Sequence, residues 1–302
     1  MTGSDFDLAS YLAQKRATVE AGFASYVGTR LGAAPRELVE AVRYSLETPG
    51  KRLRPILVLA ACEIVGGRES DAIGAALAIE MVHTYSLIHD DLPCMDDDDL
   101  RRGRPTSHKV FGEALAILAG DGLITEAFSL LATPVANPRV DAETVLSVVR
   151  DVATAAGVAG MVGGQVTDMV NQGRAVDQAA LEHMHAMKTG ALIEVAARVG
   201  ARLGGGSPDE VEVLAAYGRM LGLAFQIADD VLDVTASTAV LGKRSAKDGA
   251  RGKTTFPALL GVEGSRRRAR ELCDAASAAV GRFGAAAAPL VALARFVVER
   301  ER

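Results

Sequence analysis

The 302-residue sequence contains no tryptophan, and aromatic residues make up only 4% of it. Strands favour aromatic and β-branched side chains, whereas alanine and leucine are better helix formers. Helical periodicity recurs along almost the whole chain, and strand-like alternation is nearly absent. We therefore predict an all-α protein.

Cysteine is also scarce, with Cys62, Cys94 and Cys273 at wide spacings. An odd number of cysteines so far apart excludes a disulfide framework and a cysteine-based zinc site. The first residues have neither a basic stretch nor an apolar run, so we expect no signal peptide. These features predict a protein of the reducing cytoplasm.

The sequence lacks an excess of positive charge, because 38 acidic residues against 33 basic ones give a net charge of −5. This balance argues against a nucleic-acid-binding protein. The two most apolar stretches, 56–65 and 72–88, are interrupted by charged residues or histidine and fall short of the roughly 20 clean residues of a membrane span. We expect no membrane span and no nucleic-acid partner.

The helical pattern is divided by short glycine, proline and asparagine clusters, none of which has the length or composition of an interdomain linker. We predict a single domain over residues 1–302, built as one large helical bundle. The expected helices are 6–27, 35–48, 56–65, 71–91, 112–131, 141–161, 177–203, 208–234, 255–261, 265–283 and one that begins at Pro289.

Two acidic motifs stand out from this apolar background. The first contains Asp90, Asp91 and the run 96–99, and the second contains Asp229, Asp230 and Asp233. Each lies at the C-terminal end of a long apolar helix, where the helix dipole already leaves partial negative charge. Carboxylates in such a place need a compensating cation.

The spacing within the motifs indicates a metal site. Asp229 and Asp233 are four residues apart and share one helix face. Asp90 and Asp96 are six apart, and Pro93 between them allows the chain to fold back. The candidate ligands are all oxygen atoms, which Mg²⁺ prefers when substrate phosphates complete its coordination. One such cluster alone could be a solvated helix end, but two favour a metal.

Basic residues occur in groups that could bind phosphates. They are Lys51, Arg52 and Arg54; Arg101, Arg102 and Arg104; Lys188; and Lys243, Arg244, Lys247, Arg251 and Lys253. Each group alone could equally be a solvated surface, but basic and acidic groups side by side, as in 96–104, fit a metal–diphosphate site better. Glycine-rich nucleotide-binding patterns are absent, so we expect no nucleotide site. His83 lies on the apolar helix that ends at Asp90, either as a core residue or as a phosphate donor.

Together these residues resemble the trans-type isoprenyl diphosphate synthases of the polyprenyl synthetase family. The two aspartate-rich motifs of that family resemble Asp90-Asp91-x-x-x-x-Asp96 and Asp229-Asp230-x-x-Asp233. Supporting motifs occur in family order at 50–55, 100–103, 163–165, 188–190, 225–226 and 242–243. The two residues inserted in the first motif, Pro93 and Cys94, are similar to those of the bacterial farnesyl and plant-like geranylgeranyl branches.

The resemblance implies an isoprenoid-synthase helical bundle around a central apolar cavity, three Mg²⁺ ions per active site and a homodimer. It assigns the metal to the aspartates of the two motifs, foremost Asp90, Asp96 and Asp229. The residues implied to assist at the allylic diphosphate are Arg101, Lys188, Lys243 and Lys253. Those implied to bind the diphosphate of isopentenyl diphosphate are Lys51, Arg54, His83 and Arg102. Thr189 and Gln226 are expected to line the allylic tail and face the developing carbocation.

Product length is predicted from Tyr85, five residues before Asp90 and so about 7.5 Å further along the helix. A bulky aromatic side chain there would close the cavity after a few isoprene units, and in this family an aromatic at that place is similar to a C15 signature. We therefore expect farnesyl diphosphate (C15), with geranylgeranyl diphosphate (C20) as the alternative. Tyr85 as an ordinary core residue remains open.

Two other functions stay open. A class I terpene cyclase shares this fold, but it needs an Asn/Ser/Glu metal triad where this chain has Asp229, Asp230 and Asp233. A non-catalytic subunit of a heteromeric prenyl synthase would have decayed motifs, and both motifs are intact here.

Overall fold

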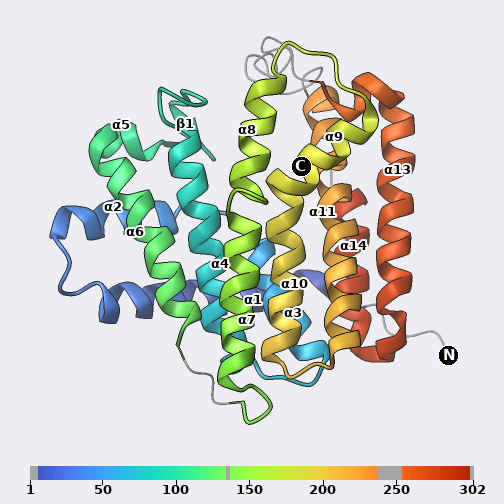
Figure 1. Cartoon of the computed structure of the whole chain (residues 1–302), viewed down its shortest axis with the longest axis horizontal. Helices are drawn as coiled ribbons and strands as arrows, with labels where there is room; N and C mark the ends of the chain where they lie inside the picture. The colour runs from blue at the N-terminus through green and yellow to red at the C-terminus, as the bar shows by residue number, and fades with distance from the viewer. Residues whose placement is uncertain (1–5, 134–136, 237–253, 300–302) are drawn as a thin grey trace.

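The computed structural model describes residues 6–133, 137–236 and 254–299 and is almost entirely helical (Figure 1). The helical elements in chain order are α1 (Leu8–Arg30), α2 (Arg36–Leu46), α3 (Leu53–Ile64), α4 (Glu69–Asp90), α5 (Ser107–Phe111), α6 (Glu113–Leu131), α7 (Ala142–Ala156), α8 (Met161–Asn171), α9 (Gln178–His185), the π-helical segment η1 (Ala186–Gly190), α10 (Ala191–Leu203), α11 (Pro208–Ala236), α13 (Phe256–Val280), the 3₁₀ segment η2 (Gly281–Ala287) and α14 (Ala288–Glu299). The all-α prediction is confirmed.

Several helices begin where a side chain caps their first turn. Asp7, Asp141 and Asp177 accept hydrogen bonds from backbone N–H groups three residues further on, at the starts of α1, α7 and α9. Such caps satisfy N–H groups that have no partner within the helix. Local sequence therefore determines these boundaries.

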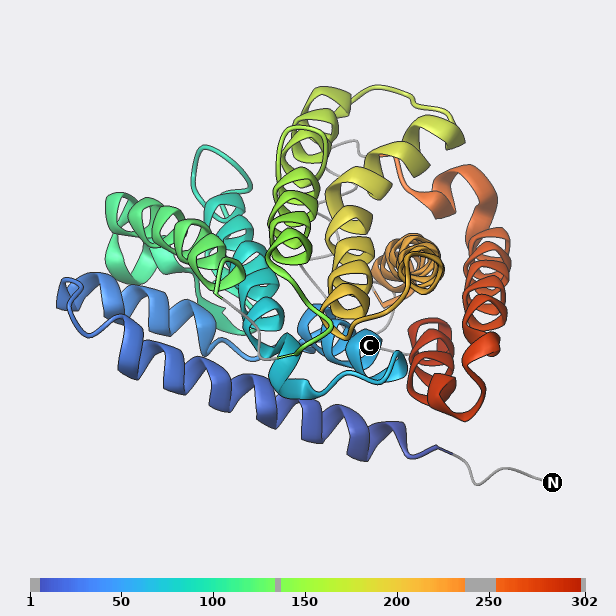
Figure 2. The same cartoon turned by 60° about the horizontal axis from the view of Figure 1, so that its bottom comes forward.

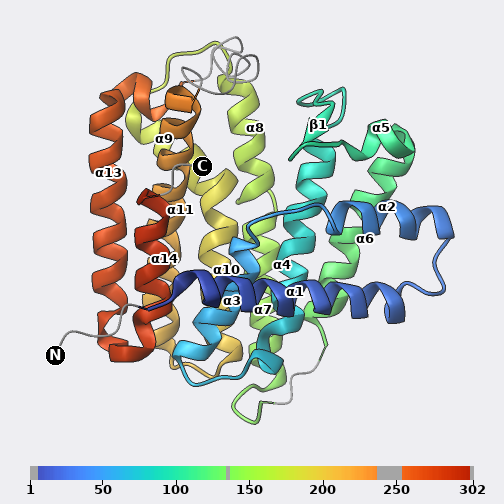
Figure 3. The same ribbon diagram turned by 180° about the vertical axis from the view of Figure 1, so that it is seen from behind.

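The helices pack as a bundle in which α4, α10 and α11 run through the middle, with α6 beside α4 and α13 beside α11 (Figure 1). Seen from the other side, α1 crosses the bundle close to α3 and α4 (Figure 3). One continuous core links the elements from α1 to α14. Its largest fully buried side chains lie mainly on the inner helices and include Leu57, Leu59, Ile79, Met81, Leu192 and Ile193.

The α3–α10 contact depends on a glycine. A Cβ atom at Gly200 would lie only 2.1 Å from the carbonyl oxygen of Val58. The absence of a side chain lets the two backbones approach closely, which positions α10 and the segment η1 before it. Figure 2 shows α10 and α3 next to one another near the centre of the bundle.

Three local predictions were wrong. The helix expected over 141–161 ends at Ala156, and α8 follows as a separate helix, because the backbone is non-helical at Gly157 (φ −81°, ψ −158°) and Gly160 (φ −127°, ψ −126°). A side chain at either position would collide with backbone carbonyl oxygens in this conformation. The helix expected over 177–203 contains the π-helical segment η1. A two-stranded antiparallel hairpin of β1 (Leu100–Arg101) and β2 (Arg104–Pro105) occurs where no strand was expected.

Four helical stretches of the described chain are long and apolar enough to cross a membrane, by length and composition alone. They are 113–131, 142–171, 208–235 and 256–299. The expectation of no span rested on 56–65 and 72–88 and did not extend to these stretches. In the stretch 208–235 half of the most apolar window is buried within the bundle, so these side chains serve the core.

Candidate active site

The first aspartate motif folds back on the end of α4. The helix ends at Asp90, and the N–H group of Asp96 donates to the carbonyl oxygen of Asp90 at 2.8 Å. The N–H group of Asp98 likewise donates to the Asp91 carbonyl at 3.2 Å. The return of the chain places Asp96 beside Asp90, although the two are six residues apart.

The Asp90 carboxyl lies in an environment that disfavours its charge. Its pKa is raised to about 6, mainly by burial and also by Asp96 and Asp91, while Lys188 and Arg101 act in the opposite direction. A carboxylate held among like charges in a partly dry site is stabilised by a cation. The electrostatics of α4 therefore favour cation binding at this end of the helix.

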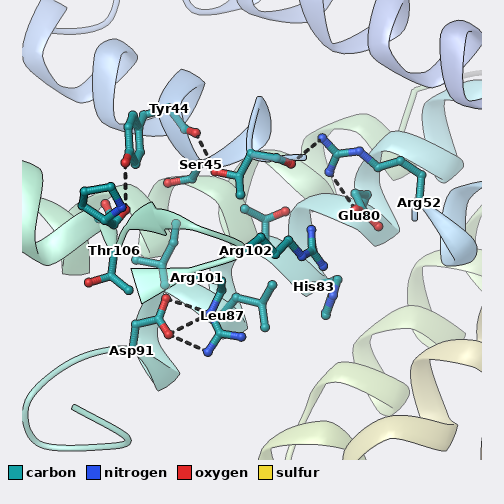
Figure 4. Close-up of a pocket in the computed structure, with 15 residues that line it drawn as sticks. Tyr44, Ser45, Arg52, Glu80, His83, Leu87, Asp91, Arg101, Arg102 and Thr106 are labelled. Carbon is teal, nitrogen blue, oxygen red and sulfur yellow. Dashed lines mark hydrogen bonds and ion pairs between the residues drawn. The ribbon is translucent and has the colours of Figure 1, made fainter. Parts of the chain in front are cut away.

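Asp91 is already paired. Its carboxylate, on a residue that is only 3% exposed, accepts hydrogen bonds from Arg101 Nε at 2.8 and 2.9 Å and from the terminal nitrogen of Arg101 at 2.5 Å (Figure 4). Such a two-pronged pair is among the strongest charge-assisted contacts in proteins. Asp91 thus fixes Arg101 against the end of α4.

The hairpin that carries Arg101 has a tight turn at Arg102 and Gly103, both with positive φ (52° and 81°). Two consecutive residues of this kind form a type I′ turn, whose twist matches that of the strands. Arg102 then reaches across and donates to the Pro49 carbonyl at 2.9 Å. A Cβ atom at Gly50 would lie 2.3 Å from the Arg102 guanidinium, so only glycine admits this contact.

A first pocket lies between this hairpin, α2 and α4 (Figure 4). Its charged lining includes Arg52, Glu80, His83, Arg101 and Arg102. Arg52 and Glu80 form an ion pair at 2.8 Å, and each side chain is only 4% exposed. Arg52 also donates to the carbonyl oxygens of Leu46 and Thr48 and lies over the Phe23 ring.

His83 and Arg54 are half-buried in this region, and the Nε atom of Arg54 is shielded from solvent. Burial lowers the pKa of His83 well below its usual value, and Arg54, Arg102, Arg101 and Arg52 lower it further. The ring is therefore held in its neutral form, in which one of its two nitrogens carries a proton and can donate. Burial also lowers the pKa of Arg54, while Glu80 and Asp229 raise it, and its Nε has no hydrogen-bond partner within the described part of the chain. An anion would satisfy this group.

The second aspartate motif lies near the C-terminal end of α11. Asp230 accepts hydrogen bonds from Gln226 Nε2 and from the Phe256 N–H group, both at 3.0 Å. The pKa of Asp230 is raised to about 6, mainly by burial, although the hydrogen bonds from Phe256 and Gln226 act to lower it; Asp233 and Asp229 act to raise it. Asp230 thereby joins α11 to the first residue of α13 and orients Gln226.

The π-helical segment η1 presents Lys188 and Thr189 to the same region. Such segments are frequent at functional sites because the extra residue redirects side chains. Thr189 Oγ1 donates to Gln226 Oε1 at 3.1 Å, and Lys188 Nζ contacts Asp168 Oδ2 at 2.6 Å. A Cβ atom at Gly164 would lie 2.3 Å from the Lys188 backbone nitrogen, so α8 approaches η1 without a side chain between them.

Asp168 was missed by the sequence analysis. It lies on α8 three residues after Gln165, within reach of the same helix face as the Gly163–Gln165 motif. The only sequence feature that pointed to Asp168 was its position about one helical turn after Gly163 and Gly164. Its partner, Lys188, is 20 residues away in the sequence, so the spacing alone did not identify the pair.

A second pocket lies beside the second motif and α8. Its polar and charged lining includes Asp168, Lys188, Gln226, Asp230 and Asp233.

A third and larger cavity lies between α4, α8 and η1 and has about 1020 Å³ of space, its open mouth included. Asp90, Lys188 and Thr189 line it together with apolar residues. The apolar and aromatic lining consists mainly of Tyr85, His89, Met95, Met161, Val162, Val166 and Met169. This distribution suits a ligand that has a charged group at the first aspartate motif and an apolar chain in the cavity.

The three pockets share residues and so form one region: His83 lines the first and the third, and Lys188 lines the second and the third. Most of the predicted site residues gather here. Lys51, Asp96 and Asp229 do not line these pockets, although Asp96 and Asp229 act electrostatically on Asp90 and Arg54, respectively. Lys243 and Lys253 lie outside the described residues.

The donor set fits Mg²⁺. Among residues 6–133, 137–236 and 254–299, no three His, Cys, Asp or Glu side chains form a ready-made metal cage. Mg²⁺ does not need one, because it binds through one or two carboxylates and completes its shell with water and phosphate oxygens. Asp90 and Asp96 on one side and Asp229 and Asp233 on the other supply oxygen ligands of this kind. The individual metal assignments, Asp91 and Asp230 included, stay predictions.

Known proteins share this sequence and fold. The sequence profile of the polyprenyl synthetase family matches residues 35–287. Geranylgeranyl pyrophosphate synthase 11, chloroplastic, of Arabidopsis thaliana is 50% identical over 301 residues, which cover 98% of this chain and 83% of that protein. The heterodimeric geranylgeranyl pyrophosphate synthase large subunit 1, chloroplastic, of the same plant is 47% identical over 302 residues, 99% of this chain and 81% of that protein.

Solved structures give the same result. An FPP/GFPP synthase from Zymomonas mobilis, in its apo form, superposes with a TM-score of 0.86 at 38% identity and covers 98% of this chain and 100% of its own. A putative farnesyl-diphosphate synthase from Marinomonas sp. MED121 gives a TM-score of 0.82 at 36% identity, covering 97% and 100%.

Proposed function

Because the chain belongs to the polyprenyl synthetase family, we propose that it condenses isopentenyl diphosphate with allylic diphosphates and forms geranylgeranyl diphosphate (C20) as its main product. It is a short-chain trans-prenyltransferase. The observation that carries the proposal is the shared region of three pockets, where acidic and basic groups meet the mouth of an apolar cavity.

The basic pocket beside α2 is the proposed site for the diphosphate of isopentenyl diphosphate. His83 and Arg102 supply donors there, and Arg54 approaches from the adjoining cavity, which His83 also lines. Lys51 is near these residues in the sequence. Neutral His83 donates one hydrogen bond, and the Arg54 guanidinium gains a partner for its Nε. Binding thus removes the free-energy cost of leaving the Arg54 Nε donor without a hydrogen-bond acceptor.

The allylic diphosphate is proposed to bind between the two aspartate motifs, next to Lys188 and Arg101. Asp90, Asp96, Asp229 and Asp233 would hold Mg²⁺, which would supply positive charge to stabilise the departing diphosphate. Lys188 and Arg101 add to this charge. We place Lys243 and Lys253 there as predictions from the sequence.

The bond from the allylic C1 to oxygen then breaks, and C4 of isopentenyl diphosphate bonds to that carbon. A proton leaves C2 of the new unit to the released diphosphate. The oxygens of Thr189 and Gln226 face the developing positive charge. The apolar cavity takes the tail and keeps water from the cation.

The two possible product lengths rest on different observations. The plant relatives, which share 45–50% of their residues with this chain, are named as geranylgeranyl pyrophosphate synthases, and this supports C20. The initial expectation of farnesyl diphosphate is the second candidate. Tyr85, 7% exposed and part of the cavity wall near Asp90, favours C15. The name of the putative farnesyl-diphosphate synthase at 36% identity supports the same length, whereas the FPP/GFPP synthase at 38% identity is named for two products.

A product assay tests the proposal. Purified protein, Mg²⁺ and labelled isopentenyl diphosphate are incubated with dimethylallyl, geranyl or farnesyl diphosphate, and the dephosphorylated alcohols are separated by length. C20 from all three starters is the expected result. C15 with farnesyl diphosphate left unused would establish the second candidate. Absence of Mg²⁺-dependent condensation would refute both and favour a non-catalytic subunit.

We also propose a homodimer in the cytoplasm. The three free cysteines support a reducing compartment, since Cys62 and Cys273 are buried apart and Cys94 is exposed. The plant relatives are named as chloroplastic. Expression of the tagged chain in its own cells, followed by fractionation, tests the location.

A further inference from the structure

His89 lies between the residue proposed to limit product length and the neighbouring helix. It is four residues after Tyr85, one turn along α4, and immediately precedes Asp90. The two rings meet edge to face, with centroids 5.6 Å apart and planes at 80°. Both rings line the apolar cavity behind the aspartate motif.

The other side of the His89 ring is fixed by α6. Nε2 lies 3.2 Å from the carbonyl oxygen of Ile117, within hydrogen-bond distance. A Cβ atom at Gly120 would lie 2.2 Å from the same nitrogen and 2.6 Å from the ring carbon beside it. The ring therefore fills the space left by a missing side chain on α6.

From this packing we infer that His89 is a positioning residue that determines product length through Tyr85. This inference rests on the proposed prenyltransferase function. Ile117 and Gly120 hold the imidazole ring, and the ring edge supports the Tyr85 side chain where it narrows the cavity. Without the imidazole, the tyrosine ring can turn into the vacated space, and the cavity becomes deeper.

The size of the effect follows from the ring contact. An edge-to-face aromatic pair contributes about 0.5–1.5 kcal/mol, which corresponds to a change of about two- to tenfold in a ratio of competing outcomes. The ratio to measure is that of prenyl alcohols longer than the main wild-type product to the main product itself. This ratio responds to cavity depth, whereas a purely structural role would alter total activity and leave the ratio unchanged.

Two substitutions at His89 distinguish the contribution of the aromatic ring from that of the hydrogen bond to the Ile117 carbonyl oxygen. His89→Ala removes both, whereas His89→Gln keeps a donor for the Ile117 carbonyl and removes the ring. We expect both to raise the ratio by about two- to tenfold. A wild-type product ratio in both variants would overturn the inference. So would a shifted ratio in His89→Ala together with a wild-type ratio in His89→Gln, because the hydrogen bond and not the ring would then determine product length.

A double-mutant cycle shows whether His89 acts through Tyr85. Tyr85→Ala alone is expected to lengthen the product, and His89→Ala should then add nothing in that background. An equal lengthening by His89→Ala with and without Tyr85 would refute the coupling. Circular dichroism and the melting temperature establish that each variant is folded.

A pair of α6 variants tests the same contact without altering a ring of the cavity. Gly120→Ala places a methyl group against the imidazole and should shift the product ratio. Gly122→Ala is the matched control, because no atom lies within 4 Å of its Cβ position, and it should leave the ratio unchanged. An unchanged ratio in Gly120→Ala would overturn the inference even if the His89 variants failed to fold.

The wild-type reaction separates this inference from the proposed function. Without any Mg²⁺-dependent prenyl product, the proposed function itself fails. Normal condensation with a product length that is insensitive to all of these substitutions refutes the role of His89 alone.

Discussion

In the part of the chain that the structure describes, three residues other than glycine have a left-handed backbone conformation, and all three lie in the turns of the candidate site. They are Arg52, Asp97 and Arg102, with φ of 51°, 49° and 52°. Such a conformation costs free energy for an L-residue with a side chain, and side-chain contacts compensate for it at two of the three. Arg52 is held by Glu80, and Arg102 by the Pro49 carbonyl. The strained turns direct charged groups toward one pocket.

The neutral form of His83 leads to a prediction about its substitution. His83→Ala should raise KM for isopentenyl diphosphate about tenfold or more, because a hydrogen bond to a charged group contributes about 1.5–3 kcal/mol. His83→Gln keeps a neutral donor and should remain within about threefold of the wild type. Steady-state kinetics with each substrate varied in turn provides the measurement, with KM for the allylic diphosphate as the internal control. A glutamine variant as poor as the alanine variant would contradict this role.

The buried pair of Arg52 and Glu80 makes a prediction about stability. Arg52→Met leaves the Glu80 carboxylate buried without its partner and should reduce the free energy of unfolding by about 3–5 kcal/mol. The double variant Arg52→Met, Glu80→Met should recover at least half of this loss. Urea unfolding followed by circular dichroism compares the three proteins. A double variant less stable than Arg52→Met would show that the pair is not the source of the effect.

At the scale of single elements, α4 carries residues of both substrate pockets. Glu80 and His83 face the basic pocket, while Tyr85 and His89 line the apolar cavity and Asp90 ends the helix at the metal site. Residues three or four apart on a helix share a face, so one rigid element fixes the distance between these functions. The position of α4 is in turn fixed by α3, α6 and α10, which pack against it.

The tight α3–α10 contact predicts opposite effects for two glycine substitutions. Gly200→Ala should destabilise the protein by about 1–3 kcal/mol, because the new methyl group meets the backbone of Val58. Gly74→Ala on α4 has open space around it and should stabilise by about 0.4–1 kcal/mol, since alanine loses less backbone entropy on folding. Melting temperatures of the two variants test the pair. Equal shifts of the same sign would contradict the packing argument.

Over the whole molecule, apolar side chains remain on the surface of the α6–α8 side of the bundle. Ile117 and Leu118 on α6 and Leu146 on α7 are exposed, Leu118 to 56%. Exposed apolar groups of this kind are typical of protein–protein contacts. They would suit the homodimer proposed above, in which this surface would be covered by a second copy of the chain.

This surface leads to a prediction about assembly. Leu118→Glu should shift the protein from dimer to monomer, because a buried unpaired carboxylate in the contact is costly. Leu259→Glu on α13 is the control, since that residue is also exposed and α13 lies on the opposite side of the bundle from α6 (Figure 1). Sedimentation velocity at several concentrations provides the measurement. A wild-type protein that is monomeric throughout would contradict the prediction.

The sequence by itself determined the features that depend on residues near one another in the chain. Helical periodicity and breaker residues established the all-α class, and the motifs around Asp90 and Asp229 identified the family and most of the site. Arguments from the helix dipole and from residue spacing apply within one helix, so they can be made without knowledge of the tertiary structure. The same arguments overlooked the hairpin at Arg102, whose turn conformation depends on two residues with positive φ.

Only the tertiary structure decided which groups meet across the fold. It pairs Asp91 with Arg101, Asp230 with the start of α13 and Lys188 with Asp168, and it packs His89 against Gly120. These contacts join residues from 10 to 31 positions apart, where side-chain direction and helix packing determine the neighbour and sequence spacing carries no such information. The residues proposed to perform the chemistry were therefore identified from the sequence, whereas the contacts that position them depend on the packing of the helices.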